Sequence, residues 1–167
     1  MAYLNPSDDA EEGFDGLLGQ SLQTTRRGDA LKAIASFLAL GERGLGLRIE
    51  RCHDAARHAA EVVTASDDLE LVHPADLTTM VFRYRPGTGA DCSDINGRLR
   101  RRLLERGEAL IGRTTVTIDG EPRTCLKLTI INPDIGPAEV EAMLELVVQT
   151  GRAVERVPSQ REQRSAS

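Results

Sequence analysis

The sequence predicts an α+β fold in which an antiparallel sheet carries helices on one face. The first observation behind this prediction is the order of the expected elements, which runs helix, two strands, helix, hairpin and helix. The second is the Asp119-Gly120 pair between two strand-like runs, a strong signal for a β-hairpin. The third is the last helical stretch, whose apolar residues recur with the helical period.

The chain is expected to divide into three parts. Residues 1–28 are acidic and rich in Gly, Asp and Pro, so they predict an irregular arm. Residues 29–157 carry the periodic apolar patterns and predict the α+β domain. Residues 158–167 are polar and predict a disordered tail.

The first helix is predicted to begin near Asp29, whose side chain can cap the N-terminus. Three glycines, Gly41, Gly44 and Gly46, should bend or break it before it resumes over residues 47–63. The apolar residues of its first part share one side of the helix. They are Leu31, Ile34, Phe37, Leu38 and Leu45.

Two strands are predicted next, over residues 69–73 and 79–85, the second bounded by a Pro-Gly turn. A helix over residues 93–106 follows and ends at Gly107, because glycine readily takes the left-handed conformation after a helix. Its apolar stripe is formed by four residues. They are Ile95, Leu99, Leu103 and Leu104.

The hairpin strands are predicted over residues 112–118 and 123–131. The last helix is predicted to begin at Pro137, since proline suits the first turn of a helix. Its apolar residues follow the spacing i, i+3, i+4, i+7 and i+8. They are Val140, Met143, Leu144, Val147 and Val148.

The composition disfavours nucleic acid and anionic membranes as partners. Lys and Arg number 21 against 26 Asp and Glu, which gives a net charge of −5, and aromatic residues make up only 3%. No apolar run approaches the roughly 20 residues that span a bilayer. Residues 1–9 also lack the basic and apolar regions of a secretory signal.

Cysteines and histidines indicate no metal site or disulfide framework. The three cysteines are far apart without CxxC spacing, which fits a reducing, cytoplasmic setting. Cys125 lies in an apolar run and is predicted to be a small buried residue. The three histidines are expected to be structural or solvated. They are His53, His58 and His73.

Motifs for phosphate loops, dinucleotides, zinc proteases and serine hydrolases do not occur in the sequence. The helix over residues 93–106 carries five arginines, whose stems can cover its apolar stripe as a solvated face. The alternative is a nucleic-acid surface, which normally interleaves aromatic residues. These arginines are Arg98, Arg100, Arg101, Arg102 and Arg106.

Residues 21–32 read SLQTTRRGDALK and place Arg26 and Arg27 just before a helix N-terminus. Such a position favours a carboxylate or a phosphate. The alternative is that both arginines pair with Asp29 or with the acidic arm.

The same segment resembles a signature of the group II pyridoxal-phosphate-dependent amino-acid decarboxylases, and further motifs follow in the order of that family. The resemblance runs from residue 2 to about residue 154 and is greatest to the bacterial diaminobutyrate or glutamate decarboxylase-like members. These further motifs are Tyr3-Leu4-Asn5-Pro6, the acidic residues 8–12, LELVHP at 69–74, VFRYRP at 81–86, LKLT at 126–129 and Asn132-Pro133.

The resemblance implies roles for two site residues. Tyr3 matches the catalytic tyrosine of a mobile loop that reaches the partner subunit and helps protonate the substrate carbon after carbon dioxide leaves. Thr25 matches a residue near the substrate side chain. The paired arginines match structural or subunit-contacting positions, and Gly28 stands where the family has an aromatic residue.

The resemblance covers only the C-terminal portion of such an enzyme, the small domain of a fold-type I enzyme. The family holds pyridoxal 5'-phosphate on a lysine that follows a histidine, whereas this sequence has no His-Lys pair. Its two lysines, Lys32 and Lys127, match non-catalytic positions. We therefore expect no cofactor and no metal on this chain alone; its cofactor-binding residues are unknown.

Two hypotheses follow. The first is a C-terminal fragment of an amino-acid decarboxylase, inactive alone, whose partner is a second copy or a separately encoded N-terminal half. The second is a stand-alone, non-catalytic binding or dimerisation module. The first predicts oligomers or marginal solubility, since faces that pack on the large domain would be exposed.

Overall fold

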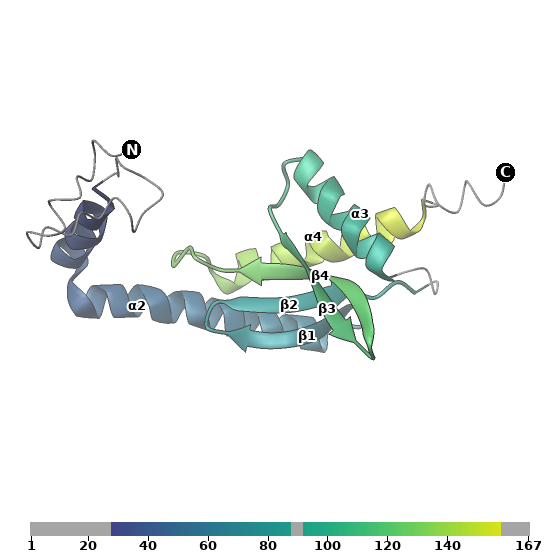
Figure 1. Ribbon diagram of the computed structural model, residues 1–167, viewed down its shortest axis with the longest axis horizontal. Coiled ribbons are helices and arrows are strands. Elements are labelled where there is room, and N and C mark those ends of the chain that lie inside the picture. Colours follow the sequence, from purple (N-terminus) through teal and green to yellow (C-terminus); the bar gives the residue numbers. More distant parts are fainter. Residues whose placement is uncertain (1–27, 88–91, 158–167) are drawn as a thin grey trace, which may run out of the picture. The chain divides into compact units, whose positions relative to one another are not determined.

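The computed structural model describes residues 28–87 and 92–157 (Figure 1). The chain divides into two compact units, residues 1–45 and residues 46–167. The expected tail at residues 158–167 lies outside the described residues. The elements in chain order are α2 (Asp29–Ala65), β1 (Leu69–Asp76), β2 (Thr79–Tyr84), α3 (Cys92–Glu105), β3 (Gly112–Ile118), β4 (Glu121–Thr129) and α4 (Pro137–Glu155).

Helix α2 is interrupted at Gly41, whose φ of 64° and ψ of 174° are not helical. A positive φ favours glycine because it lacks a Cβ atom, so the predicted break is confirmed at this position. Gly44 and Gly46 lie inside the helix instead of breaking it. Asp29 is the first helical residue, and its carboxylate pairs with Lys32 at 2.8 Å.

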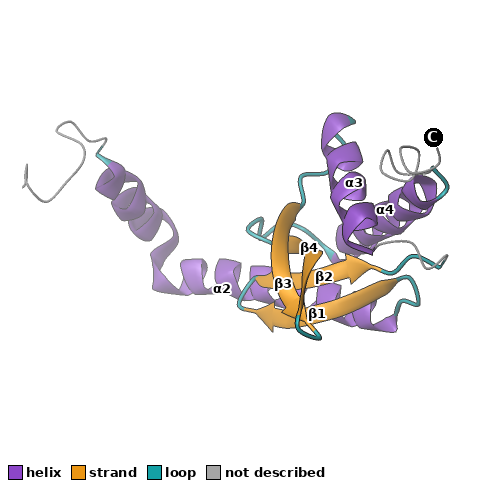
Figure 2. Cartoon of the chain, turned by 45° about the vertical axis from the view of Figure 1, so that its right-hand side comes forward, coloured by secondary structure: helices purple, strands orange, loops and turns teal. Residues whose placement is uncertain are grey.

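The four strands form one antiparallel sheet in the order β1-β2-β4-β3 (Figure 2). Asp119 and Gly120 have φ of 53° and 81° and connect β3 to β4. Two residues of positive φ are typical of the tight turn whose twist matches the strands, so the predicted hairpin is confirmed. Strand β4 ends at Thr129, two residues earlier than predicted.

The core lies between one face of the sheet and the helices. Alternate residues of β2 are buried, and they belong to one apolar cluster with residues of α2, α3 and α4. Because side chains alternate across a strand, this one-sided core leaves the other face of the sheet without a helix from the part of the chain that the structure describes. The predicted fold class is confirmed. The fully buried members with the largest side chains include Met80, Phe82, Tyr84, Leu99, Leu103, Leu126 and Leu144.

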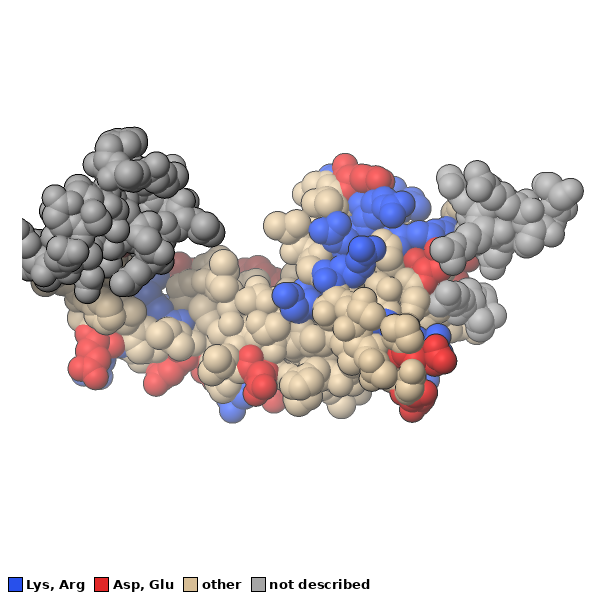
Figure 3. Space-filling view, viewed as in Figure 1, with Lys and Arg blue, Asp and Glu red and all other residues tan. Residues whose placement is uncertain are grey.

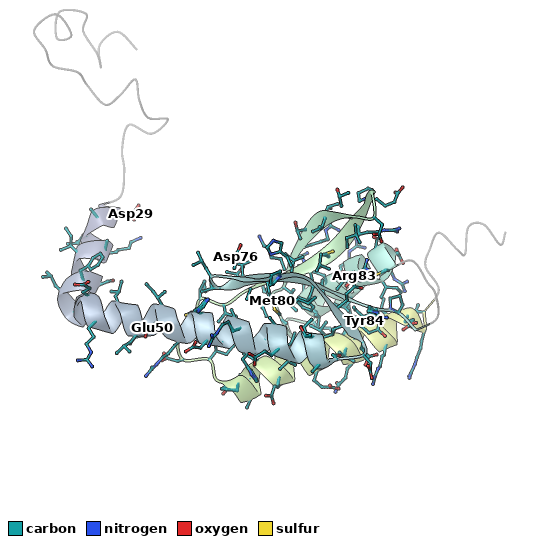
Figure 4. All side chains as sticks on the ribbon, turned by 90° about the horizontal axis from the view of Figure 1, so that it is seen from below. Asp29, Glu50, Asp76, Met80, Arg83 and Tyr84 are labelled. Atoms are coloured by element: carbon teal, nitrogen blue, oxygen red, sulfur yellow. The ribbon has the colours of Figure 1, made fainter. Side chains whose placement is uncertain are left out.

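Tyr84, at the end of β2, joins three elements (Figure 4). Its hydroxyl donates to Glu155 of α4 at 2.8 Å, and its ring lies against Gly151, where a Cβ atom would come within 2.7 Å of the ring. The Asn96 side chain accepts from the Tyr84 N–H at 2.9 Å and donates to the Tyr84 carbonyl at 3.0 Å. The end of β2 is thereby held to both α3 and α4.

Two predicted apolar positions differ from the structure. Met143 of α4 is half-buried, whereas its neighbours on the stripe are buried. Leu104 of α3 is exposed, because it is adjacent in sequence to the buried Leu103 and lies about 100° further around the helix. The core-facing stripe of α3 is therefore narrower than the sequence predicts.

Candidate functional site

The two residues predicted to act in catalysis and substrate binding, Tyr3 and Thr25, lie outside the described residues. The paired arginines at positions 26 and 27 do too. Their roles therefore stay predictions. The described part of the chain instead shows the surroundings of the two lysines, the free face of the sheet and the surface of α2.

Both lysines are exposed. Lys32 lies in the first turn of α2 beside Asp29. Lys127 lies on β4 between the buried Leu126 and Leu128, so its side chain projects from the face without helices. It passes over Gly112 of β3, where a Cβ atom would lie 3.3 Å from the Lys127 Cε. Neither lysine is enclosed as an amine that holds a cofactor would be.

The helix-free face of the sheet carries a bidentate ion pair. Arg83 of β2 donates from Nε and Nη2 to the two carboxylate oxygens of Glu70 on β1, both at 2.9 Å. Cys125 of β4 is buried near this pair, and burial raises the pKa of its thiol. Its exposed fraction of 0% confirms the prediction that Cys125 is a small buried residue. A protonated thiol in such a place is a poor nucleophile.

Two hollows lie between α2 and the α4 region. The first, of about 550 Å³, is lined mainly by charged residues of α2 and by residues 133–137. The second, of about 610 Å³, has an apolar floor and the acidic rim residues Glu141 and Glu145. Among the described residues that line these hollows there is no lysine, so neither could hold an aldehyde cofactor through an amine.

Two histidines make contacts that fit a structural role. The Nε2 atom of His58 in α2 lies 2.9 Å from Oε1 of Glu141 in α4. The Nδ1 atom of His73 lies 3.1 Å from the Pro74 carbonyl oxygen. Within the part of the chain that the structure describes, no three His, Cys, Asp or Glu side chains gather as a metal site requires.

Arginines gather over α3, as Figure 3 shows. Arg98 pairs with Asp94 at 3.1 Å and donates to the carbonyls of Val154 and Val157 at the end of α4. Arg100 donates to the Ile111 carbonyl at 3.2 Å. These two members of the cluster satisfy backbone carbonyls, which supports the structural interpretation over a nucleic-acid surface.

The first part of α2 presents an unusual apolar surface. Four large side chains on one side of this helix face solvent, although the sequence predicts an apolar stripe of the kind that normally packs on a core. The exposed fractions are 72% for Leu31, 54% for Ile34, 58% for Phe37 and 83% for Leu38. Their spacing was visible in the sequence, whereas their exposure was not.

Comparison with known proteins identifies related chains. L-2,4-diaminobutyrate decarboxylase of Rhizobium meliloti (strain 1021) is 36% identical over 154 residues, which are 92% of this chain and 30% of that protein. The L-2,4-diaminobutyrate decarboxylase of Acinetobacter baumannii is 35% identical over 148 residues, covering 87% of this chain and 28% of that protein. The chain thus spans about 30% of the length of these relatives. No family model matches the sequence.

Comparison with solved structures also finds similarity to decarboxylases. The glutamate decarboxylase domain of diaminobutyrate-pyruvate transaminase and L-2,4-diaminobutyrate decarboxylase from Vibrio parahaemolyticus has a TM-score of 0.71 and 31% identity, over 86% of this chain and 29% of that chain. Oryza sativa TDC with PLP has a TM-score of 0.67 at 22% identity, over 89% of this chain and 32% of that chain, and supports the fold alone.

The fold is that of the C-terminal domain of fold-type I pyridoxal-phosphate-dependent decarboxylases. Within that class, the chain is a homologue of the C-terminal portion of the group II amino-acid decarboxylases, and the relatives at 35–36% identity are L-2,4-diaminobutyrate decarboxylases. Residues 28–87 and 92–157 include no helix with the length and apolar character that a bilayer span needs.

Proposed function

We propose that this chain serves as the C-terminal part of a pyridoxal-phosphate-dependent amino-acid decarboxylase acting in the cytoplasm. The observation that carries the proposal is the 36% identity over 92% of the chain to a decarboxylase. The names of both relatives make L-2,4-diaminobutyrate the first substrate to try. The described residues do not fit the cofactor on their own, since both lysines are exposed.

The cofactor, held by the larger part of such an enzyme, would supply the electron sink that lets the substrate lose its carboxylate. Tyr3 would hold a proton on its phenol oxygen and deliver it to the substrate α-carbon. Thr25 would lie beside the substrate side chain and restrict its size. Both roles rest on the match of these residues to the family motifs.

The alternative is a non-catalytic binding or dimerisation module derived from this domain. It is favoured if the isolated chain is a monodisperse monomer that forms no complex with a decarboxylase large domain. The decarboxylase proposal instead expects that the 167 residues alone neither bind pyridoxal 5'-phosphate stoichiometrically nor release carbon dioxide.

A chimera tests the proposal with the two parts joined. The 167 residues replace the matching C-terminal portion of the Rhizobium meliloti relative, and carbon dioxide release from L-2,4-diaminobutyrate is measured. We expect activity in the chimera and none in the isolated chain. An inactive chimera that binds cofactor normally, or an active isolated chain, would contradict the proposal.

Tyr3→Phe in the same chimera tests the proton donor. Loss of the phenol proton should lower kcat by about 10²-fold or more while cofactor absorbance stays unchanged. Thr25→Ala should change KM more than kcat, because this residue is assigned to binding. An unchanged kcat in Tyr3→Phe would remove Tyr3 from the mechanism.

A further inference from the structure

The hollow between the end of α2 and α4 combines an apolar floor with negative charge. Residues 137–149, which form one wall, carry three glutamates and no lysine or arginine. Two of these glutamates, Glu141 and Glu145, line the hollow one helical turn apart. An occupant should therefore bring both apolar surface and positive charge. The floor is formed by Val62, Leu69, Leu144 and Val148.

The contacts of the two glutamates leave them open to a cation from outside the hollow. The Oε1 atom of Glu141 lies 2.9 Å from His58 Nε2, and Oε1 of Glu145 accepts from the Gln149 amide at 3.1 Å. Both glutamates are exposed. Among the residues that the structure describes, no lysine or arginine pairs with either carboxylate.

The surface of α3 has the opposite charge. Residues 98–106 carry five arginines and one glutamate (Figure 3). Two of the arginines, Arg101 and Arg102, form no ion pair within residues 28–87 and 92–157. Arg101 is exposed and lies only about 60° around the helix from Leu104.

Exposed leucines accompany these arginines. Leu104 is 43% exposed and Leu110 is 80% exposed. Arg100 precedes Leu104 by about one helical turn, and its Nε donates to the Ile111 carbonyl at 3.2 Å, which holds Leu110 close to α3. Leu104 and Leu110 therefore form an apolar knob beside the arginines of α3.

We propose that the knob of one copy of this chain docks in the hollow between α2 and α4 of a second copy. Leu104 and Leu110 then cover the apolar floor, while Arg101 pairs with Glu145. The two surfaces differ, so the contact is heterologous, and each added copy leaves one knob and one hollow open. The inference does not rest on the proposed function.

A second copy accounts for both surfaces at once. Nucleic acid would pair with the arginines but would leave the leucines and the hollow exposed. A small cation would neutralise the glutamates but would not cover the apolar floor. The knob supplies apolar side chains and positive charge together, as the hollow requires.

Sedimentation equilibrium of the full chain tests the contact. A contact of this small size is weak, so the average mass should rise between about 10 µM and 1 mM and pass that of a dimer. Raising the salt from about 0.05 to 0.5 M should weaken the association, because exposed charges are screened. A monomer throughout, or an association indifferent to salt, would overturn the proposal.

A charge swap identifies the surfaces that meet. Arg101→Glu and Glu145→Arg should each weaken the association by about tenfold or more, and the double variant should restore it to within about threefold. Single variants without effect, or a double variant without recovery, would show that these residues do not meet.

Matched variants control for net charge and test the apolar part. Arg48→Glu in α2 and Glu121→Arg in β4 make the same charge changes at exposed positions outside both surfaces and should leave the association unchanged. Leu110→Ser keeps the charge and should weaken the association by about tenfold. If the controls weaken it as much as the swap variants do, net charge and not this contact governs it.

The chain's own residues 158–167 are the other candidate occupant, since they include two arginines. Deleting them should leave the association unchanged. If association appears only after this deletion, the tail occupies the hollow in the intact chain and the proposal is wrong.

Discussion

Asn96 makes, at the end of β2, the hydrogen bonds that a neighbouring strand would otherwise make. Pairing of β2 with β4 ends at Phe82 and Leu126, which leaves the Tyr84 N–H and carbonyl without a strand partner on that side. The Asn96 amide bonds to both, and its NH₂ also donates to the Cys92 carbonyl at 2.7 Å. A fully buried amide is tolerated here because each of its polar atoms is satisfied.

Asn96→Ala should therefore lower the free energy of unfolding by about 2–4 kcal/mol, because it leaves buried backbone groups without partners. Urea unfolding followed by circular dichroism measures the change. Asn132→Ala is the control, since the exposed Asn132 side chain accepts a single bond from the Asp134 N–H. Its cost should stay below about 1 kcal/mol.

The hydroxyl of Tyr84 makes the free energy of unfolding depend on pH in the alkaline range. Burial, helped by the hydrogen bond to Glu155, raises the pKa of Tyr84 above its ordinary value of about 10. The folded protein then keeps the proton while unfolded chains release it. Stability is full below about pH 10 and falls as pH rises further.

Urea unfolding between about pH 8 and 11 checks this direction. The wild-type free energy of unfolding should decline above about pH 10, and Tyr84→Phe should remove that part of the decline. If the two proteins show parallel curves throughout, Tyr84 does not carry the dependence.

At the scale of elements, the contact between α4 and β2 depends on a missing side chain. Gly151 is buried in α4, and a Cβ atom there would lie 2.7–2.8 Å from three atoms of the Tyr84 ring. Ordinary carbon contacts need more than 3.4 Å, so either the ring or the helix would have to move. Close approach of helix and strand therefore requires glycine at this position.

Gly151→Ala should lower the free energy of unfolding by about 1–3 kcal/mol through overpacking. Gly97→Ala is the matched control, because Gly97 lies in α3 with open space around its Cβ position. That change should raise stability by about 0.5–1 kcal/mol, since alanine favours helix over glycine. Thermal unfolding of both variants gives the comparison, and effects of equal sign would refute the packing argument.

At the scale of the whole molecule, stability should differ between the two units. Among the described residues, the members of the apolar core all lie within residues 46–157, whereas the stripe on residues 31–38 is exposed. Local opening is easiest where little apolar surface is buried.

Hydrogen exchange of the isolated chain should follow this difference. Amides of α4 around Leu144 should exchange at least about 100-fold more slowly than those around Ile34. Mass spectrometry of peptic fragments can resolve the two regions. Equal protection would mean that the two units open together.

The functional prediction also belongs to this scale. The motifs at residues 69–74, 81–86 and 126–133 predicted a decarboxylase relative, and the comparisons confirm that relationship for the C-terminal portion. In the structure these motifs lie on β1, on β2 and on β4 and its following loop. The segments that carry the family resemblance therefore lie mostly on the sheet. The roles of Tyr3 and Thr25 stay predictions.

Periodicity and turn chemistry in the sequence were sufficient to predict the elements, because both depend on a few neighbouring residues. The Asp119-Gly120 hairpin, the break at Gly41 and the start of α4 at Pro137 are local features of this kind. The fold class followed from their order.

Only the folded chain shows the strand order and the contacts of Asn96 and Gly151 with Tyr84. It alone also shows that Leu104 and the α2 stripe are exposed. An apolar stripe in a sequence indicates that one face of a helix can be buried. It does not identify the surface that buries this face. That surface is set by contacts between residues far apart in the chain.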